Sequence, residues 1–404
     1  MANSLLTPTE VTREALRILH QKCNFIGSIN RQYDDRFAKS GAKIGDTLTI
    51  RLPNEYSVRT GATLNVEDTA ETSTTLQVST QKGVDMSFSS VDLTMDIDDF
   101  SARVLKPAMS VLAANIENDA LSMYKDVSKE VSDVGAAMTV ADVLNMGKDL
   151  YTSLVPEDDL CLLLHPQANV DLVDALKGLF NAQAQLGENY KKGQVANNFM
   201  GFDKVFQNSL MPIHTTGSDD GTGDHKVGAA DQSGSSITHG SEGTGTLAVG
   251  DIVTFAGCNE VHPETKVSTG RLKQFTVTAA MTAVATTVSI SPSIVVSGAK
   301  QNVSAAPSAA GAITKWESDR STAIGASADY QISMGYHKDA FAFATADLKM
   351  PKGVDFSARE VMDGISMRII QAYDINNDKF PCRLDVLYGY KTLREQLAVR
   401  GGFN

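Results

Sequence analysis

The sequence has few aromatic residues and none of the common motifs of nucleotide-binding or hydrolytic enzymes. Aromatic side chains make up 6% of the 404 residues, so the core must be built mainly from Ala, Val, Leu and Met. None of the patterns G-x-x-x-x-G-K-[ST], G-x-S-x-G or H-E-x-x-H occurs. The Gly-rich region from Gly240 to Gly250 neither follows a predicted strand nor opens a helix, as a dinucleotide fingerprint must. Phosphate binding is therefore unsupported.

Cysteine and histidine are too scattered to spell a metal site. The four cysteines never form CxxC, so free and mostly buried thiols are expected. The seven histidines never pair at metal-ligand spacing, and His165 and His337, beside predicted strand ends, are expected to be hydrogen-bonded structural residues. Asp219, Asp220, Asp224 and His225 could hold a loose cation, but their setting favours a solvated loop. No catalytic residue, cofactor site or metal site is predicted.

The chain also lacks a basic surface and a long apolar run. Its formal net charge is −12 and no cluster of Lys and Arg stands out, which argues against general nucleic-acid binding. No apolar run approaches the ~20 residues of a membrane span, so no membrane association is predicted. The N-terminus has no basic region followed by an apolar core, and we expect a protein that is made inside a cell without secretion.

The longest helical pattern runs from Asp98 to Val131. Pro107 must either kink this helix or open its second segment. A sheet is expected along a helix of this length, although the same pattern fits an ordinary core helix of an α+β enzyme. The apolar residues recur at steps of three and four, which places one apolar stripe on the helix: Leu105, Met109, Leu112, Ile116, Ala120, Met123 and Val127. Four charged residues fall outside that stripe: Glu117, Asp119, Lys125 and Asp126.

The N-terminal part of the chain predicts a helix followed by a long hairpin. Thr7 can cap a short amphipathic helix that opens with Pro8 and ends before Asn24. The alternating run from Lys43 to Leu52 predicts a strand. A polar excursion follows, and two further strands are predicted at Thr75–Thr80 and Val84–Ser89, with a turn at residues 81–83. The hairpin is expected to stand away from the core; a disordered surface loop is the alternative.

The central part predicts α+β structure interrupted by β-structure. Thr139 and Asp142 are expected to cap a helix that runs to Leu154. A continuous apolar strand at Leu160–Leu164, buried on both faces of a mixed sheet, should precede a helix to Leu179 and an edge strand at residues 203–206. The Gly- and Ser-rich span 217–245 is expected to build neither a helix nor a core. Short strands then predict a small β-barrel or sandwich: Thr246–Val249, Asp251–Phe255, Gln274–Thr278 and Thr286–Ile290.

The C-terminal part returns to α+β structure. Strands are predicted at Tyr330–Met334, Ala340–Ala344, Ile365–Asp374 and Lys379–Tyr388. In the last strand, Arg383, Asp385 and Tyr388 alternate with apolar residues. We therefore expect one α+β fold whose two halves flank an inserted β-domain.

The order of these segments closely resembles that of tailed-phage major capsid proteins of the Hong Kong 97-like fold. The resemblance is strongest to the coat-protein branch with an inserted β-domain, typified by Salmonella phage P22. It spans nearly the whole chain, and its short motifs are specific mainly through their order. The segments that carry it are Leu163–Gln167, Gly193–Ala196, Gly201–Asp203, Gly250–Gly257 and Met334–Phe341.

This resemblance implies an N-terminal arm (1–42), an extended loop hairpin with flanking strands (43–90) and a peripheral domain with a spine helix (91–138). It further implies an axial domain (139–216 and 317–404, the latter returning to the peripheral domain) with an inserted β-barrel domain (217–316). The implied function is that of a structural coat protein that assembles into the icosahedral head of a double-stranded DNA phage. Cytoplasmic assembly in the host bacterium and no enzymatic activity are implied as well.

Partners and contact residues are implied in the same way. The chain is expected to contact itself in hexamers and pentamers, to meet a scaffolding protein, a portal protein and a decoration protein, and to enclose DNA without reading its sequence. Some relatives lock the shell through a Lys in the extended loop, but this sequence has no Lys between Pro53 and Gln81, so noncovalent contacts are expected. The candidate subunit or scaffold contacts are Glu10, Glu14, Arg59, Glu67 and Asp68.

Other interpretations fit parts of the sequence. Arg13 and Arg17 stand beside Glu10 and Glu14, so a paired and solvated helix face is an alternative to a scaffold contact. The Thr-, Ser- and Gly-rich middle also suggests a surface-exposed or adhesive β-rich protein. A hydrolase using His337 and Asp339 would lack a nucleophile motif.

Overall fold

The chain forms two compact units in a computed structural model. One unit comprises Met1–Leu52, Ser73–Leu121 and Phe341–Leu393, and the other comprises Pro53–Thr72, Ser122–Ala340 and Arg394–Asn404. The residues that the structure describes are 8–34, 47–56, 58, 61–62, 72–88, 106–176, 199–219, 225–240, 243–282, 284–316, 326–354, 356–362, 365–375 and 380–403.

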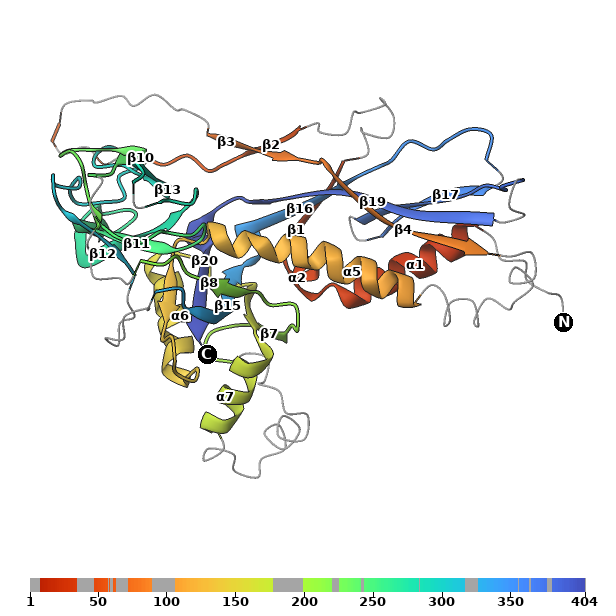
Figure 1. Ribbon diagram of the computed structural model, residues 1–404, viewed down its shortest axis with the longest axis horizontal. Coiled ribbons are helices and arrows are strands. Elements are labelled where there is room, and N and C mark those ends of the chain that lie inside the picture. Colours follow the sequence, from red (N-terminus) through yellow and green to blue (C-terminus); the bar gives the residue numbers. More distant parts are fainter. Residues whose placement is uncertain are drawn as a thin grey trace. The chain divides into compact units, whose positions relative to one another are not determined.

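A six-stranded sheet organises the first unit (Figure 1). The central strand of this sheet is β19. It pairs along one edge with β4, and along the other edge with β18 and then with β16. Helices α1 and α5 pack against each other, α1 also against β17 and α5 against β4. The elements are α1 (Pro8–Lys22), α2 (Asn24–Ser28), β1 (Asn30–Asp34), β4 (Thr80–Phe88), α5 (Lys106–Leu121), β16 (Phe341–Ala346), β17 (Phe356–Met362), β18 (Ile365–Gln371) and β19 (Phe380–Thr392).

The long helix is shorter than predicted. α5 ends at Leu121, a 3-10 turn, η3 (Ser122–Asp126), follows, and the chain becomes strand β5 at Glu130. Pro107 lies in the first turn of α5, where its missing N–H breaks no hydrogen bond, so it opens the helix. The predicted start at Asp98 lies outside the described residues. The apolar stripe is buried as expected from Met109 to Val127, and Leu105 lies outside the described residues. Glu117 is buried too, and its carboxylate accepts a hydrogen bond from the backbone N–H of Phe25 at 2.8 Å.

The predicted hairpin of two strands on either side of the polar excursion is present, but its predicted turn is not. Strand β2 (Thr47–Arg51) pairs with β3 (Ser73–Gln77), and the expected turn at residues 81–83 lies inside the continuous strand β4. The hairpin base does not stand away from the core. Leu76 is fully buried and packs on the apolar cluster of β16 and β19, with Leu48 and Ile50 against the same cluster.

The second unit contains a mixed six-stranded sheet in the order β5-β20-β15-β6-β7, with β8 also paired to β15. The apolar strand β6 is buried throughout and β7 lies at an edge, as predicted. The capping box predicted for α6 is confirmed, because the Thr139 side chain accepts from the Asp142 backbone N–H and the Asp142 carboxylate accepts from the Thr139 N–H, the latter at 2.7 Å. The elements are β5 (Glu130–Ser132), α6 (Val140–Thr152), β6 (Leu160–Leu164), α7 (Pro166–Leu176), β7 (Lys204–Gln207), β8 (Ile213–Thr215), β15 (Asp329–His337) and β20 (Ala398–Phe403).

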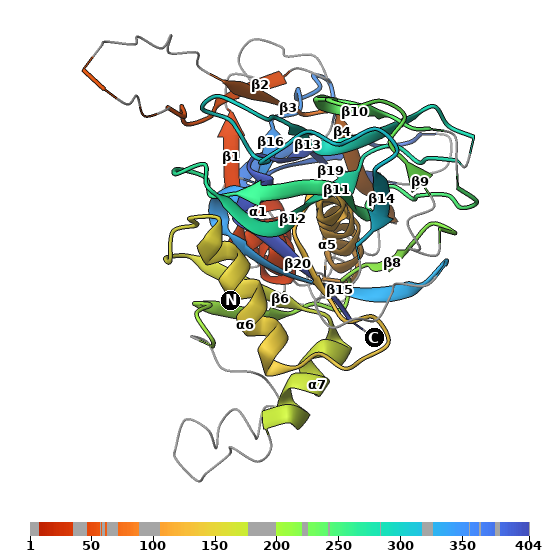
Figure 2. The same ribbon diagram turned by 90° about the vertical axis from the view of Figure 1, so that its left-hand side faces the viewer.

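A second sheet of this unit closes on itself (Figure 2). Its strand order is β10-β13-β12-β11-β14-β9, and its two ends are joined by a bridge between Val227 and His239. The strands are β9 (His225–Lys226), β10 (Gly234–Thr238), β11 (Ile252–Val261), β12 (Ser268–Val277), β13 (Thr287–Ile294) and β14 (Ala312–Lys315). The span 217–245 was expected to build no core, yet Val227 and Ile237 belong to the apolar cluster inside this sheet.

The four cysteines are free and buried. Burial raises the pKa of Cys161 and Cys258 to about 11 and that of Cys382 to about 12, and it also raises the pKa of Cys23. Because the thiolate is the reactive form, about one thiol in a thousand is ionised at pH 8 for a pKa near 11. We expect alkylation of the folded chain at pH 8 to be at least ~100-fold slower than in urea. Mass spectrometry after timed iodoacetamide labelling measures this; equal rates would contradict it.

Candidate functional site

The candidate contact residues are only partly within the described structure. Arg59, Glu67 and Asp68 lie outside it, and of Glu10 only the backbone, in α1, is described. Glu14 is ion-paired with Arg17, whose Nη2 lies 2.7 Å from Glu14 Oε1. This pairing supports the alternative of an internally paired helix face, and a scaffold contact at these residues stays a prediction.

The histidines considered for catalysis have structural partners. His337 is buried and its Nδ1 accepts a hydrogen bond from the N–H of Asp339 at 3.2 Å, while the Asp339 carboxylate is mostly exposed and 4.0 Å away. His165 Nδ1 accepts from the N–H of Gln167 at 3.2 Å, and burial lowers the pKa of His165. Within the described ranges, no three His, Cys, Asp or Glu side chains gather as a metal site would need.

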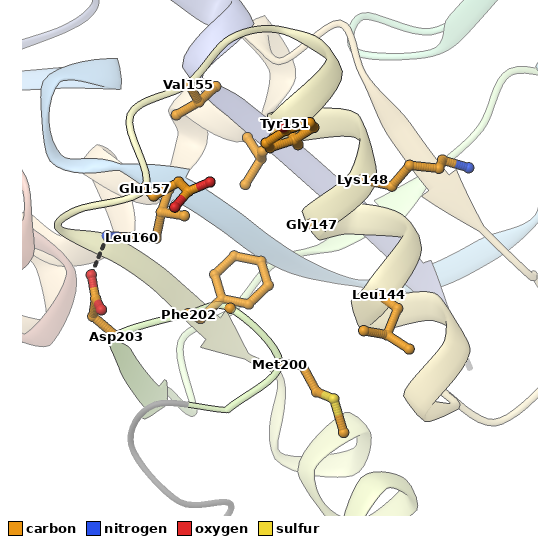
Figure 3. A pocket seen from close by; sticks show the side chains of 12 residues that line it. Leu144, Gly147, Lys148, Tyr151, Val155, Glu157, Leu160, Met200, Phe202 and Asp203 are labelled. Atoms are coloured by element: carbon orange, nitrogen blue, oxygen red, sulfur yellow. Dashed lines mark hydrogen bonds between the residues drawn. The ribbon is translucent and has the colours of Figure 1, made fainter.

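An apolar groove with a volume of about 710 Å³ lies between α6 and the turn at residues 199–203 (Figure 3). Phe202 lies in its middle, Tyr151 lies toward one end, and Leu144 and Met200 lie at the other. Tyr151 is 70% exposed and Leu144 is 51% exposed. Large apolar side chains at this exposure are rarely gathered in one place unless another surface covers them.

The groove arises because α6 carries two apolar stripes. Val143, Met146 and Leu150 face the core, whereas Leu144 and Tyr151, seven residues apart, share an exposed face beside it. The seven-residue spacing of the second stripe was visible in the sequence, but its exposure was not.

The opposite wall is a tight turn. Phe199 and Phe202 exchange two backbone hydrogen bonds of 3.0 Å, with φ of 50° at Met200 and 90° at Gly201. Positive φ at both central residues is the geometry of a type I′ turn, which favours Gly at the second position. The turn holds Met200 at its tip, and Leu160 N–H donates to the Asp203 carboxylate at 3.1 Å.

A buried ion pair lies between the mixed sheet and the closed sheet. Arg400 Nε donates to Glu130 Oε2 at 2.5 Å, with both side chains fully buried. The Tyr330 hydroxyl donates to the same carboxylate at 3.1 Å, and Arg400 Nη2 donates to the carbonyl oxygen of Gly250 at 2.5 Å. Burial would lower the pKa of Arg400, but Glu130 holds it above its ordinary value.

Further hydrogen bonds join the same two sheets. Gln274 of β12 bonds both backbone groups of Glu130, at 2.7 and 3.0 Å. His214 of β8 contacts the Asp251 carboxylate at 2.9 Å through Nε2 and the Tyr124 hydroxyl at 3.0 Å through Nδ1. These contacts tie the closed sheet to the mixed sheet at several points, so a force on one sheet is transmitted to the other.

The structure is an α+β scaffold with an apolar groove open on its surface. Comparison with protein families gives the particular family. The model described as "P22 coat protein - gene protein 5" matches residues 26–402, and the chain therefore belongs to the P22 coat protein family. It is a structural capsid protein of a bacteriophage and resides in the virion capsid. The predicted α+β fold class and capsid function are confirmed.

Several solved structures from phages and a virus-like particle are similar over most of the chain. A chain of Mycobacterium phage Che8 is 10% identical with a TM-score of 0.42, covering 91% of this chain and 88% of that chain. The mature capsid of bacteriophage PhiM1 is 12% identical with a TM-score of 0.44, covering 94% and 86%. A virus-like particle from Pyrococcus furiosus is 6% identical with a TM-score of 0.41, covering 97% of each. A search of curated proteins gave no match. No helix among the described residues is long and apolar enough to cross a membrane.

Proposed function

We propose that copies of this chain form hexamers and pentamers that close into an icosahedral head, and that the groove beside α6 is a contact between neighbouring copies. The observation that carries this proposal is the exposed apolar groove on a chain whose family builds capsids. The chain that covers the groove would be another copy of this chain, because every subunit of a shell is surrounded by copies of itself.

The charges around the groove favour a second copy. Lys148 is exposed on α6. Glu157, Asp158 and Asp159 are exposed in the segment that follows the C-terminal end of α6. This surface has an apolar centre, with one cation and several carboxylates at its rim. When two copies meet, the cation of one copy can lie against the carboxylates of the other. Rim charges of this kind guide orientation, while the apolar centre supplies affinity.

Replacing Tyr151 with Glu should weaken assembly. A large aromatic residue that becomes covered in an interface can contribute about 2 kcal/mol or more. We therefore expect the critical concentration for particle formation to rise at least ~10-fold, measured by sedimentation velocity over a concentration series.

The matched control is Tyr151→Phe, which keeps the ring and should assemble as the unaltered chain does. Fluorescence of Trp316, the single tryptophan, verifies that each variant is folded. A folded Tyr151→Glu variant that assembles at the original concentration would remove the groove from the interface.

The remaining parts of the proposal concern partners and domains. The chain would act without enzymatic activity, assemble in the host cytoplasm with a scaffolding protein and a portal protein, and accept a decoration protein. The net charge of −12 supports weak, sequence-independent contact with packaged DNA, since like charges repel. The extended-loop, spine, axial and inserted-domain boundaries given above are part of the same proposal.

A further inference from the structure

The groove beside α6 is acidic at one end. Glu157 lines the groove (Figure 3), and Asp158 and Asp159 follow it in the chain, all three exposed. The structure gives Asp159 a cation, with Lys204 Nζ 3.9 Å from Asp159 Oδ1, but gives none to Glu157 or Asp158 among the described residues. A carboxylate that becomes covered needs a partner, because burying an unpaired charge is costly. A chain that covers this groove is therefore expected to bring cations as well as apolar side chains.

Within a ring of five or six copies, a groove is covered by a different surface of the next copy. Rotation about the ring axis relates each copy to the next, so every contact in the ring joins two different surfaces. This step rests on the proposed function, in which the groove is a contact between neighbouring copies. The covering surface must therefore lie elsewhere on this chain.

The described surface of the same unit is a poor match for the groove. Its exposed apolar side chains outside the groove are mostly single aliphatic residues, such as Val170, Ile213, Val267 and Val284. The one exposed aromatic side chain in this described part, apart from the groove, is Tyr56, at 63%. Tyr56 belongs to the span 53–72, which has four acidic residues and one basic residue and would add negative charge to an acidic rim.

The segment 177–198 has the composition expected of a chain that covers the groove. It lies outside the described residues. Its only acidic residue is Glu188, so it carries a net charge of +2 in a chain whose net charge is −12. Tyr190 is followed directly by two lysines, so one aromatic ring and two cations are presented together. The aliphatic, aromatic and basic residues of the segment include Leu179, Phe180, Leu186, Tyr190, Lys177, Lys191 and Lys192.

The ends of this segment place it close to the groove. It begins after Leu176, the last residue of α7, and it leads into Phe199, the first residue of the turn that forms the wall opposite α6. Its 22 residues can extend roughly 35 Å outward and return, at ~3.3 Å per residue. Helix α6, with 13 residues, is only about 20 Å long. The segment can therefore span a groove on a neighbouring copy.

We propose that residues 177–198 of one copy cover the groove of the next copy in the ring. Tyr190 packs against Phe202 in the middle of the groove, and the two lysines that follow Tyr190 lie beside Glu157 and Asp158. The aromatic pair adds to the burial of apolar surface, and the charge pairs set the orientation of the segment. Each copy donates one segment and accepts another, so a closed ring leaves no groove exposed.

Photo-crosslinking of mixed particles tests this assignment. The full-length chain carries Tyr190→benzoylphenylalanine, and equal amounts of ¹⁵N-labelled and unlabelled chain are mixed, assembled and illuminated. Mass spectrometry identifies the joined peptides and their labels. We expect adducts between residue 190 and peptides of α6 or of the turn at residues 199–203, with labelled peptides joined to unlabelled ones.

The matched control is Tyr56→benzoylphenylalanine, which should give no adduct in the groove. Three results would overturn the inference. In the first, the groove adducts join only peptides of the same label, which means that the segment covers the groove of its own chain. In the second, particles form but the adducts from residue 190 lie outside the groove. In the third, residue 56 is the position that gives groove adducts.

A charge swap tests the same contact without a photoreactive group. Lys191→Glu together with Lys192→Glu places like charges opposite each other, so we expect the critical concentration for particle formation to rise at least ~10-fold. Adding Glu157→Lys and Asp158→Lys restores opposite charges and should reverse most of that rise. No recovery in the four-residue variant, with folding verified by Trp316 fluorescence, would overturn the inference.

This inference and the proposed function fail separately. If Tyr151→Glu leaves assembly unchanged, the groove is not an interface and both are wrong. If Tyr151→Glu weakens assembly while the adducts from residue 190 lie outside the groove, the groove remains a contact between copies and only the assignment of residues 177–198 is wrong.

Discussion

Replacing Arg400 with Met is expected to lower the free energy of unfolding by about 3–5 kcal/mol. The guanidinium group is the charged partner of Glu130 in a region without solvent access. Without it, the carboxylate stays buried with only the Tyr330 hydroxyl and a like-sized apolar side chain beside it. Removing one member of a buried pair costs far more than the pair itself contributes, because an uncompensated charge remains.

Two further variants make this expectation specific. Lys204→Met removes the cation of an exposed pair in the same unit, where Lys204 Nζ lies 3.9 Å from Asp159 Oδ1 and both side chains are about half exposed; a loss within about 0.5 kcal/mol is expected. The double variant Arg400→Met, Glu130→Leu should recover much of the stability, because no charge remains buried. Urea unfolding monitored by Trp316 measures all three. Equal effects of Arg400→Met and Lys204→Met would contradict the account.

Replacing Gly389 with Ala should have the second largest effect on stability. A Cβ on Gly389 would lie 2.1 Å from the carbonyl oxygen of Gln77 and 3.0 Å from Cα of Val78. Both atoms belong to backbone, so strand β3 itself must move away from β19, and the packing of Leu76 on the apolar cluster is lost with it. Overpacking of this kind costs about 1–3 kcal/mol or more.

Hydrogen exchange of peptides from β2 and β3 measures this effect. Exchange should accelerate about tenfold for each 1.4 kcal/mol lost. Gly27→Ala is the matched control in the same unit: a Cβ there meets nothing within 4 Å, and Ala in helix α2 should be neutral or stabilising by up to about 1 kcal/mol. Unchanged exchange in Gly389→Ala would show that the hairpin base does not rest on β19 as described.

Helices and strands that are determined by residues close together in the chain could be predicted from the sequence. The capping box of Thr139 and Asp142 marked the start of α6, and the five-residue apolar run marked β6, because both signals depend on neighbours in the chain. The long helix was overextended because helical spacing continues past Leu121 through Met123 and Val127. Met123 is buried in the 3-10 turn and Val127 just after it, and spacing alone does not distinguish these conformations from a continued α-helix.

Features that depend on distant residues were not predictable. Arg400 and Glu130 are 270 positions apart, and neither residue type suggests burial without its partner. Asp385 was predicted to alternate with the apolar residues of its strand, yet it is buried as they are, and Arg368 binds its carboxylate at 2.6 Å. The span 217–245 looked unable to form a core because its few apolar residues, such as Val227 and Ile237, matter only once the sheet closes.

The candidate site also combines features that depend on neighbouring residues with features that depend on distant ones. The second apolar stripe of α6 and the Met200–Gly201 turn could be identified from spacing and composition. Their juxtaposition could not, because it depends on the pairing of β7 with β6, which brings the turn beside the helix. The groove is thus a product of sheet topology acting on two locally readable segments.

Electron cryomicroscopy of particles formed by the full-length chain tests the central claim most directly. The account predicts closed shells of hexamers and pentamers in which the groove around Tyr151 is covered by a neighbouring copy of the chain. Two results would contradict it. One is a shell in which Tyr151 and Leu144 face open solvent in every copy. The other is a chain that forms only small open oligomers even when its scaffolding and portal proteins are present.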